Sequence, residues 1–148
     1  MKRKLLALVL MVMCLLTFFA TTAAAAVSPN EAIMPCYENV INVIPEFKLN
    51  SAGELCVKVA YYGNSTTFAQ AKITVEIEKR FLGLFWRTVD IGYTDNLWVQ
   101  YSTSCNGVFS NTFASDGKGT YRATIQLEFF GKNGVTDVIE RTIECAYD

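Results

Sequence analysis

The sequence predicts an all-β protein, built as an antiparallel sandwich of seven strands and cross-linked by two disulfides. Apolar residues recur at every second position through much of the chain, which indicates strands rather than helices. Turns that contain glycine or asparagine separate these runs, and an even number of cysteines follows an N-terminal export segment. A small closed barrel is the alternative architecture.

Residues 1–26 have the three parts of a cleavable signal peptide. Basic residues occupy positions 2–4, and the uncharged apolar run over 5–20 is short for a bilayer span of about 20 residues. Small side chains at 24–26 then favour cleavage before Val27. We therefore expect a secreted, extracellular protein, with an uncleaved N-terminal anchor as the alternative.

Cleavage would leave 122 of the 148 residues, a length typical of one domain. Residues 27–39 contain two prolines and are expected to form a loose leader, and residues 40–148 are expected to form the sandwich. The remaining 10 basic and 14 acidic residues give a net charge of −4. This balance argues against nucleic acid as a partner and does not suggest an anionic membrane surface, and we expect no stable membrane insertion after cleavage.

The strands are predicted from alternation and from the turns between them. The clearest alternation runs through Ala71, Ile73, Val75 and Ile77. The strongest hairpin signal is Asn133-Gly134. Residues 108–113 could add a further short strand. The seven expected strands cover residues 40–49, 54–62, 68–79, 85–91, 97–102, 120–130 and 135–145.

The segment Gly119-Thr120-Tyr121-Arg122-Ala123 resembles the tyrosine corner of immunoglobulin-like and fibronectin-like sandwiches. The resemblance implies that Tyr121 begins a strand and turns its hydroxyl back to the backbone of the preceding loop. Ala123 stands where antibody domains carry a cysteine. Asp116 is displaced by one residue from the immunoglobulin pattern, which argues against a true antibody-type domain.

The mature chain is also similar to a group of small, uncharacterised secreted β proteins of Gram-positive, largely clostridial bacteria. The similarity rests on Gly53 before Leu55-Cys56, on the alternating strand that ends near Lys79, on Trp86 with Val89, and on the Gly-Thr-Tyr-Arg segment. It implies a bacterial origin, a location and a fold class, and it implies no activity.

Four cysteines, Cys36, Cys56, Cys105 and Cys145, remain after cleavage and permit three disulfide connectivities, with free thiols and a metal site as the alternatives. The sandwich order brings the start of its second strand near the end of its fifth, which favours Cys56 with Cys105 and leaves Cys36 with Cys145. A strict fibronectin topology instead places the beginning of the first strand and the end of the last at opposite poles.

The sequence points to no catalytic or metal site, and we expect neither enzymatic activity nor a cofactor. It contains no histidine, the usual group for proton transfer near neutral pH, and no close pair of cysteines for zinc. Aromatic residues concentrate in the middle third, and Trp98 departs from the parity of Leu97, Val99 and Tyr101. These residues predict a binding surface for a glycan, an envelope component or a protein, formed by Phe81, Trp86, Tyr93 and Trp98. The alternatives are core packing of these aromatics, and an extracellular structural or stress-related protein without a ligand site.

Overall fold

The computed structural model describes residues 37–147. The signal peptide, its cleavage site, most of the predicted leader and Cys36 lie outside the described residues. Within them the chain is all-β, with two antiparallel sheets packed as a β-sandwich, so this part of the prediction is confirmed. The described part contains no helix long and apolar enough to cross a membrane.

Eight strands and one turn of 3₁₀ helix follow one another along the described chain. In order they are β1 (Val40–Leu49), β2 (Leu55–Gly63), β3 (Phe68–Phe81), β4 (Phe85–Thr88), η1 (Thr94–Asn96), β5 (Leu97–Ser102), β6 (Asn106–Phe113), β7 (Gly119–Gly131) and β8 (Thr136–Tyr147).

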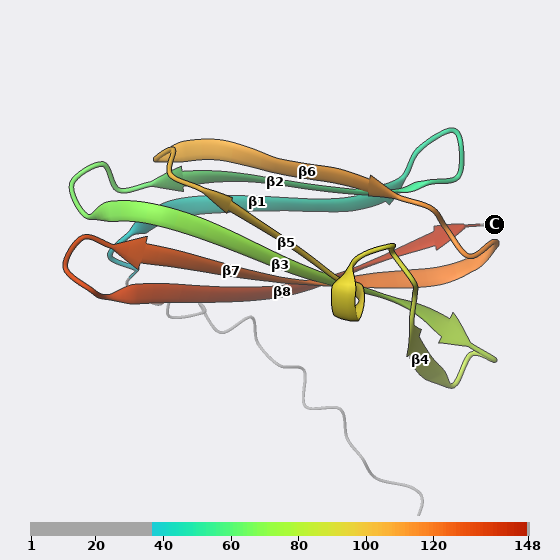
Figure 1. Cartoon of the computed structure of the whole chain (residues 1–148). Helices are drawn as coiled ribbons and strands as arrows, with labels where there is room; N and C mark the ends of the chain where they lie inside the picture. The colour runs from blue at the N-terminus through green and yellow to red at the C-terminus, as the bar shows by residue number, and fades with distance from the viewer. Residues whose placement is uncertain (1–36, 148) are drawn as a thin grey trace, which may run out of the picture. The chain divides into compact units, whose positions relative to one another are not determined.

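The strands form two layers. One sheet has the order β1-β2-β6, and the other has the order β4-β3-β7-β8, with β5 also paired to β3 (Figure 1). Strand β3 therefore has two partners on one edge: residues 71–76 pair with β5 and residues 78–81 pair with β4. Pro45, which has no N–H to donate, lies in β1, an edge strand of its sheet.

The core lies between the two sheets and follows the predicted alternation. Ile73, Val75 and Ile77 of β3 are fully buried and face the other layer, while the side chains between them are partly exposed. Strand β7, the neighbour of β3 in the same sheet, repeats the pattern, and its Ile125 pairs in register with Val75. Because successive side chains of a strand point to opposite faces, the two-residue period alone places these residues in the core.

The strand count differs from the prediction because residues 106–113 form a full strand. They pair with β2 along eight residues, from Leu55 with Phe113 to Tyr62 with Asn106. Only Phe109 and Phe113 of this segment are buried, and apart from exposed Val108 its other residues are glycine or polar. Such a composition gives little hydrophobic alternation, so the segment resembles a loop in the sequence although backbone pairing holds it in the sheet.

The predicted disulfide between Cys56 and Cys105 is wrong, because both thiols are free. Cys56 pairs in register with Thr112, whereas Cys105 precedes Asn106 at the other end of the same strand pair. Six residues of antiparallel strand separate the two ends by about 20 Å, and a disulfide requires Cα atoms within about 7 Å. The prediction required residues 97–102 to neighbour the second strand, but these residues pair with β3, and β6 is the neighbour of β2.

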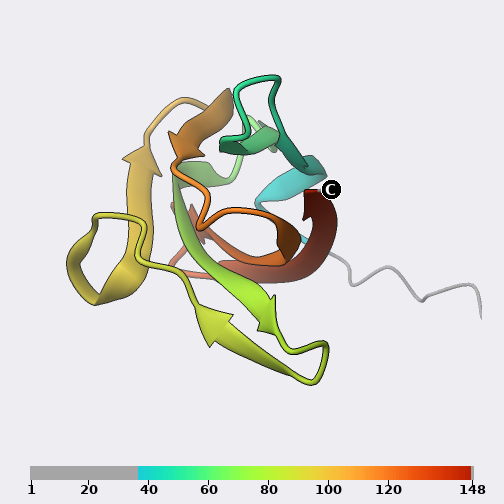
Figure 2. The same cartoon turned by 90° about the vertical axis from the view of Figure 1, so that its right-hand side faces the viewer.

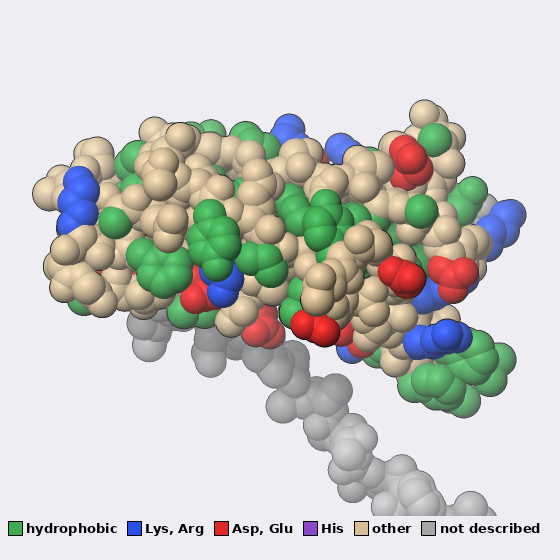
Figure 3. Space-filling model, in the orientation of Figure 1, with side chains coloured by type: hydrophobic (Ala, Val, Ile, Leu, Met, Phe, Trp, Pro, Cys, Tyr) green, Lys and Arg blue, Asp and Glu red, His purple; other side chains and the backbone are tan. Residues whose placement is uncertain are grey.

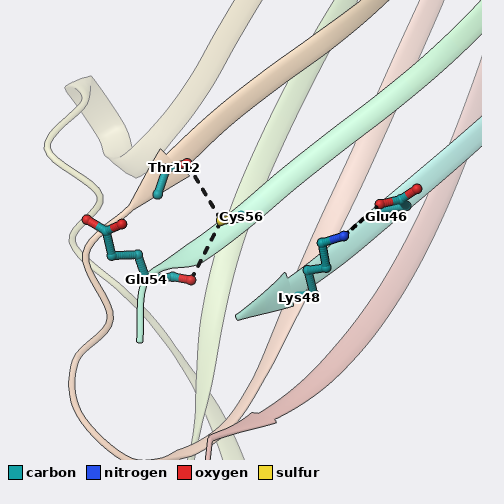
Figure 4. Close-up of polar contacts among 5 residues, drawn as sticks. All are labelled: Glu46, Lys48, Glu54, Cys56 and Thr112. Carbon is teal, nitrogen blue, oxygen red and sulfur yellow. Dashed lines mark hydrogen bonds and ion pairs between the residues drawn. The ribbon is translucent and has the colours of Figure 1, made fainter. Parts of the chain in front are cut away.

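The remaining cysteine positions show why no other described pair forms. Cys56 lies on the outer face of its sheet, where its Sγ is 3.7 Å from Thr112 Oγ1 and 3.8 Å from the carbonyl oxygen of Glu54 (Figure 4). Cys145 pairs in register with buried Tyr121, is free, and packs against the core from the other sheet. The predicted Cys36–Cys145 bond involves a residue outside the described part of the chain.

Candidate functional site

The β3–β4 hairpin carries the densest group of exposed apolar side chains. Four of the 13 large hydrophobic residues that are exposed in the described chain fall within five consecutive positions. We call them the hairpin tip: Phe81, Leu82, Leu84 and Phe85. Leu82 is 76% exposed and Leu84 is 82% exposed. Figure 2 shows this hairpin standing away from the rest of the sandwich, and Figure 3 shows hydrophobic side chains gathered at its free end.

The turn of the hairpin places a leucine in an unfavourable backbone conformation. Leu82 and Gly83 have φ values of 50° and 70°, and Leu84 N donates to Phe81 O at 3.0 Å. Two positive φ values are typical of a type I′ turn, where asparagine or aspartate followed by glycine is preferred. A leucine in the left-handed region costs about 1 kcal/mol or more relative to glycine. The tip therefore keeps an apolar side chain at a position that backbone preference assigns to a polar one.

A cluster that we call the arginine clamp fixes the base of the hairpin. The guanidinium of Arg122 lies 4.4 Å from the ring centroid of Trp86, and that of Arg80 lies 5.9 Å from it. Arg122 Nε is 2.5 Å from Glu78 Oε2, and this hydrogen bond raises the pKa of the arginine, which keeps its charge. Arg80 Nε also donates to Gly83 O at 3.1 Å, so it ties the turn to the clamp.

A pocket with several charged lining residues adjoins the same hairpin. It has a volume of about 450 Å³ and is lined by β3, β4 and the loop before β7. Its charged lining residues are three cations, Lys79, Arg80 and Arg87, and two carboxylates, Asp90 and Asp116. Lys79 Nζ donates to the backbone carbonyl of Asp116 and lies 5.5 Å from the Tyr121 ring centroid. The pocket thus combines a positive balance of charge with direct continuity to the hairpin tip.

The structure separates the four predicted binding residues into two groups. Phe81 lies at the tip, with its ring centroid 5.2 Å from that of Phe85, and Trp86 lies half-buried in the arginine clamp. Trp98 is only 4% exposed and packs edge-on against Phe113. Trp98 therefore does not belong to the predicted binding surface and follows the alternative of core packing, because it pairs with buried Val75 and shares the inner face. In β5 the inner face therefore carries Trp98, whereas Val99 and Tyr101 are exposed.

Tyr93 is exposed, and it contacts Phe113, the ring neighbour of Trp98, rather than the hairpin. Its ring is 46% exposed, packs edge-on against Phe113, and its hydroxyl accepts a hydrogen bond from Asn111 Nδ2 at 3.0 Å. The prediction missed Leu82, Leu84 and Phe85 as surface residues. The available signal was Gly83 in the middle of an unbroken apolar run, which is typical of a turn that exposes its neighbours.

No protein-family model, curated protein or solved structure matches this chain. Within residues 37–147, no group of three or more acidic, histidine or cysteine side chains is placed to hold a metal ion. The hairpin tip, the arginine clamp and the adjoining pocket are therefore the features on which a functional proposal depends.

Proposed function

We propose that this protein is a secreted, non-catalytic binding module whose contact surface is the β3–β4 hairpin. The observation that carries the proposal is the exposure of four large apolar side chains at the free end of one hairpin. Contiguous exposed apolar side chains are typical of interaction sites, whereas single ones are ordinary. The tip contributes nothing to the core, so its apolar character needs a cause outside folding.

The scaffold behind the tip supports the same proposal. Backbone strain at Leu82 is the kind of local cost that concentrates at functional sites. The two arginines that flank Trp86 and the hydrogen bond from Arg80 to Gly83 hold the hairpin in one geometry. A rigid contact surface loses less conformational entropy on binding, which favours affinity.

The finer fold assignment that we propose is an immunoglobulin-like or fibronectin-like sandwich. Three observations support it: the first, second and sixth strands share one sheet, the third, seventh and eighth share the other, and Tyr121 donates its hydroxyl hydrogen to Gly117 O. A tyrosine at the start of the penultimate strand that bonds a few residues upstream matches a tyrosine corner. Modules of this architecture carry many unrelated functions, so the fold alone identifies no ligand.

Export and kinship with the secreted clostridial-type proteins belong to the same proposal and rest on the sequence features of residues 1–26 and 53–122. Intact-mass measurement of protein recovered from culture medium should give the mass of a chain that begins at Val27. Recovery of only the full-length chain, in membranes, would contradict export.

The binding proposal is tested by retention on bacterial envelope fragments. The probes are whole envelopes of a Gram-positive bacterium and the same envelopes after lipid extraction. We expect Leu84→Asp to lower retention about tenfold on at least one probe, because it places a charge in an apolar contact. The matched control is Ile41→Asp on β1, where the parent side chain is 75% exposed, and it should behave as wild type.

Equal retention of wild type and Leu84→Asp on every probe would contradict the binding proposal. That result would favour the alternative, an extracellular structural protein without a ligand site. The burial of Trp98 is the observation that fits this alternative, since it removes one predicted surface aromatic.

A further inference from the structure

We infer that the hairpin tip inserts into a lipid surface that carries anionic phosphate headgroups. This inference rests on the proposed binding function and names the partner of the same site. Peripheral, reversible contact by one hairpin differs from the stable membrane insertion of a spanning segment, which the sequence argues against.

The shape of the site fits a bilayer better than a protein groove. The tip is convex, and its two most exposed residues, Leu82 and Leu84, lie in the turn on either side of Gly83. The tip spans about two strand positions, or about 7 Å, beyond Arg80 and Trp86. Interfacial protein segments bury apolar groups about 5–10 Å into the boundary between headgroups and acyl chains. The tip therefore has the reach that such contact requires.

The chemistry of the tip points the same way. Energetically dominant residues of protein interfaces are enriched in tryptophan, tyrosine and arginine, and leucine is under-represented among them. The outermost side chains here are leucines, which need only an apolar environment and no matching pocket. Trp86 lies one pair behind the tip, at the level where tryptophan is enriched in membrane proteins, between apolar and aqueous surroundings.

The charges around the hairpin complement anionic headgroups. Residues 79–89 contain three cations, Lys79, Arg80 and Arg87, and no acidic residue, although the predicted mature chain has a net charge of −4. Arg80 lies in the first residue pair behind the tip, and Lys79 and Arg87 form the second pair, where headgroup phosphates would lie once the leucines enter the bilayer. Figure 3 shows Lys or Arg side chains next to the hydrophobic end of the hairpin. The hairpin sequence is therefore positively charged, although the predicted mature chain as a whole is negatively charged.

The adjoining pocket offers space for a headgroup. Its volume of about 450 Å³ opens beside three cations, and the hydroxyl of Ser115 is a further donor on its wall. Two carboxylates also line it, of which Asp90 accepts a hydrogen bond from Gly92 N at 2.9 Å. Arg87, on the exposed strand β4, has no described ion pair and is the cation that we expect to contact phosphate.

The test is co-sedimentation of the secreted protein with two kinds of vesicle, one of phosphatidylcholine alone and one of phosphatidylcholine mixed with phosphatidylglycerol. We expect binding to the mixed vesicles, weaker binding to the neutral ones, and loss of the difference at high salt. Leu84→Asp should lower binding to the mixed vesicles about tenfold or more, since it places a charge in the apolar boundary. Trp86 fluorescence, measured in Trp98→Phe protein, should shift to shorter wavelength when mixed vesicles are added.

Matched variants separate the apolar and the electrostatic contributions. Arg87→Gln should lower binding to the mixed vesicles severalfold and leave binding to neutral vesicles unchanged. Ile41→Asp and Arg141→Gln make the same chemical changes on other exposed positions and should bind as wild type does. Circular dichroism of each variant checks that it is folded.

The outcomes distinguish the lipid inference from the binding proposal. Absence of binding to both vesicle types, or equal binding of wild type and Leu84→Asp, would overturn the lipid inference. If the lipid-extracted envelopes still retain wild type but not Leu84→Asp, the hairpin binds a non-lipid partner and the binding proposal stands. If Leu84→Asp behaves as wild type on vesicles and on envelopes alike, both fail.

Discussion

The stretch from Ala71 to Phe85, which runs through β3 and the turn that follows it, has two halves that obey opposite rules. Over Ala71 to Ile77, every second side chain is buried in the sandwich and the strand is paired on both edges. Beyond Lys79 the strand leaves the sandwich, keeps only β4 as a partner, and ends in the exposed hairpin tip. Both halves are rich in apolar residues, but only the first half uses them to form the core.

The difference shows that apolar residues of a strand are no longer buried where the strand extends beyond the sandwich. In the first half, a buried isoleucine contributes about 1.5–3 kcal/mol of transfer free energy to folding. In the second half, the leucines remain in water, and Leu82 adds a backbone cost. The proposed partner would provide the burial that these side chains lack within the fold.

The largest expected effect is the contrast in stability between the two halves. Ile73→Ala should lower the free energy of unfolding by about 2–5 kcal/mol, because it leaves a cavity between the sheets. Leu84→Ala should change it by less than about 0.5 kcal/mol, because that side chain contacts water. Urea denaturation followed by circular dichroism measures both. A loss above about 1 kcal/mol for Leu84→Ala would show that the tip packs against the fold.

A smaller effect is expected at the start of β7, within the sandwich. Tyr121→Phe removes the hydrogen bond to Gly117 O and should cost about 0.5–1.5 kcal/mol, with the freed carbonyl as the main penalty. The control is Tyr62→Phe, because Tyr62 lies exposed on the outer face of β2. Equal stability of the two variants in urea would mean that the Tyr121 hydroxyl does not stabilise the loop.

The hairpin tip should respond in the opposite sense. Leu82→Asn is expected to stabilise the protein by about 0.5–1 kcal/mol, because asparagine tolerates positive φ at the first turn position. Leu84→Asn makes the same chemical change without a positive φ and should be close to neutral. If Leu82→Asn destabilises the protein, the leucine supports folding and the contrast between the sandwich part of β3 and the hairpin tip is weaker than we describe.

The smallest expected effect is a difference in labelling rate between the thiols of Cys56 and Cys145. Burial raises the pKa of the Cys145 thiol above its ordinary value of 9.0, so the folded state favours the neutral form. The resulting stabilisation is fully present below the ordinary pKa and is lost as the pH rises through the higher folded value. Since the thiolate is the nucleophile, iodoacetamide at pH 8 should label Cys145 more slowly than Cys56. Peptide mapping by mass spectrometry gives the two rates, and equal rates would contradict the burial of Cys145.

The two-sheet sandwich was predictable from the sequence, because burial on one face imposes a two-residue period on strands such as β3 and β7. The hairpin at Asn133-Gly134 was predictable from its turn residues, and Gly134 has a φ of 81°. Strand β6 was predicted only as a short segment, since backbone pairing with β2 holds it without a strong apolar pattern.

The binding residues were only half predictable for a related reason. An apolar run such as residues 81–86 looks the same in sequence whether a second sheet covers it or not. Trp98 differs from its neighbours in parity, but parity alone does not say which face is the inner one. That depends on the register of β5 against β3, which is set by contacts distant in the chain.

Gly63, at the end of β2, has a consequence for how this fold can diverge. A Cβ atom built at Gly63 would lie 2.6 Å from the backbone oxygen of Cys105, which accepts a hydrogen bond from Gly63 N at 2.7 Å. Any larger residue must push the two strands apart there, so distant homologues that keep this junction should also keep a glycine at its position. Alignment anchored on that glycine offers a way to detect relatives whose overall sequence differs widely from this one.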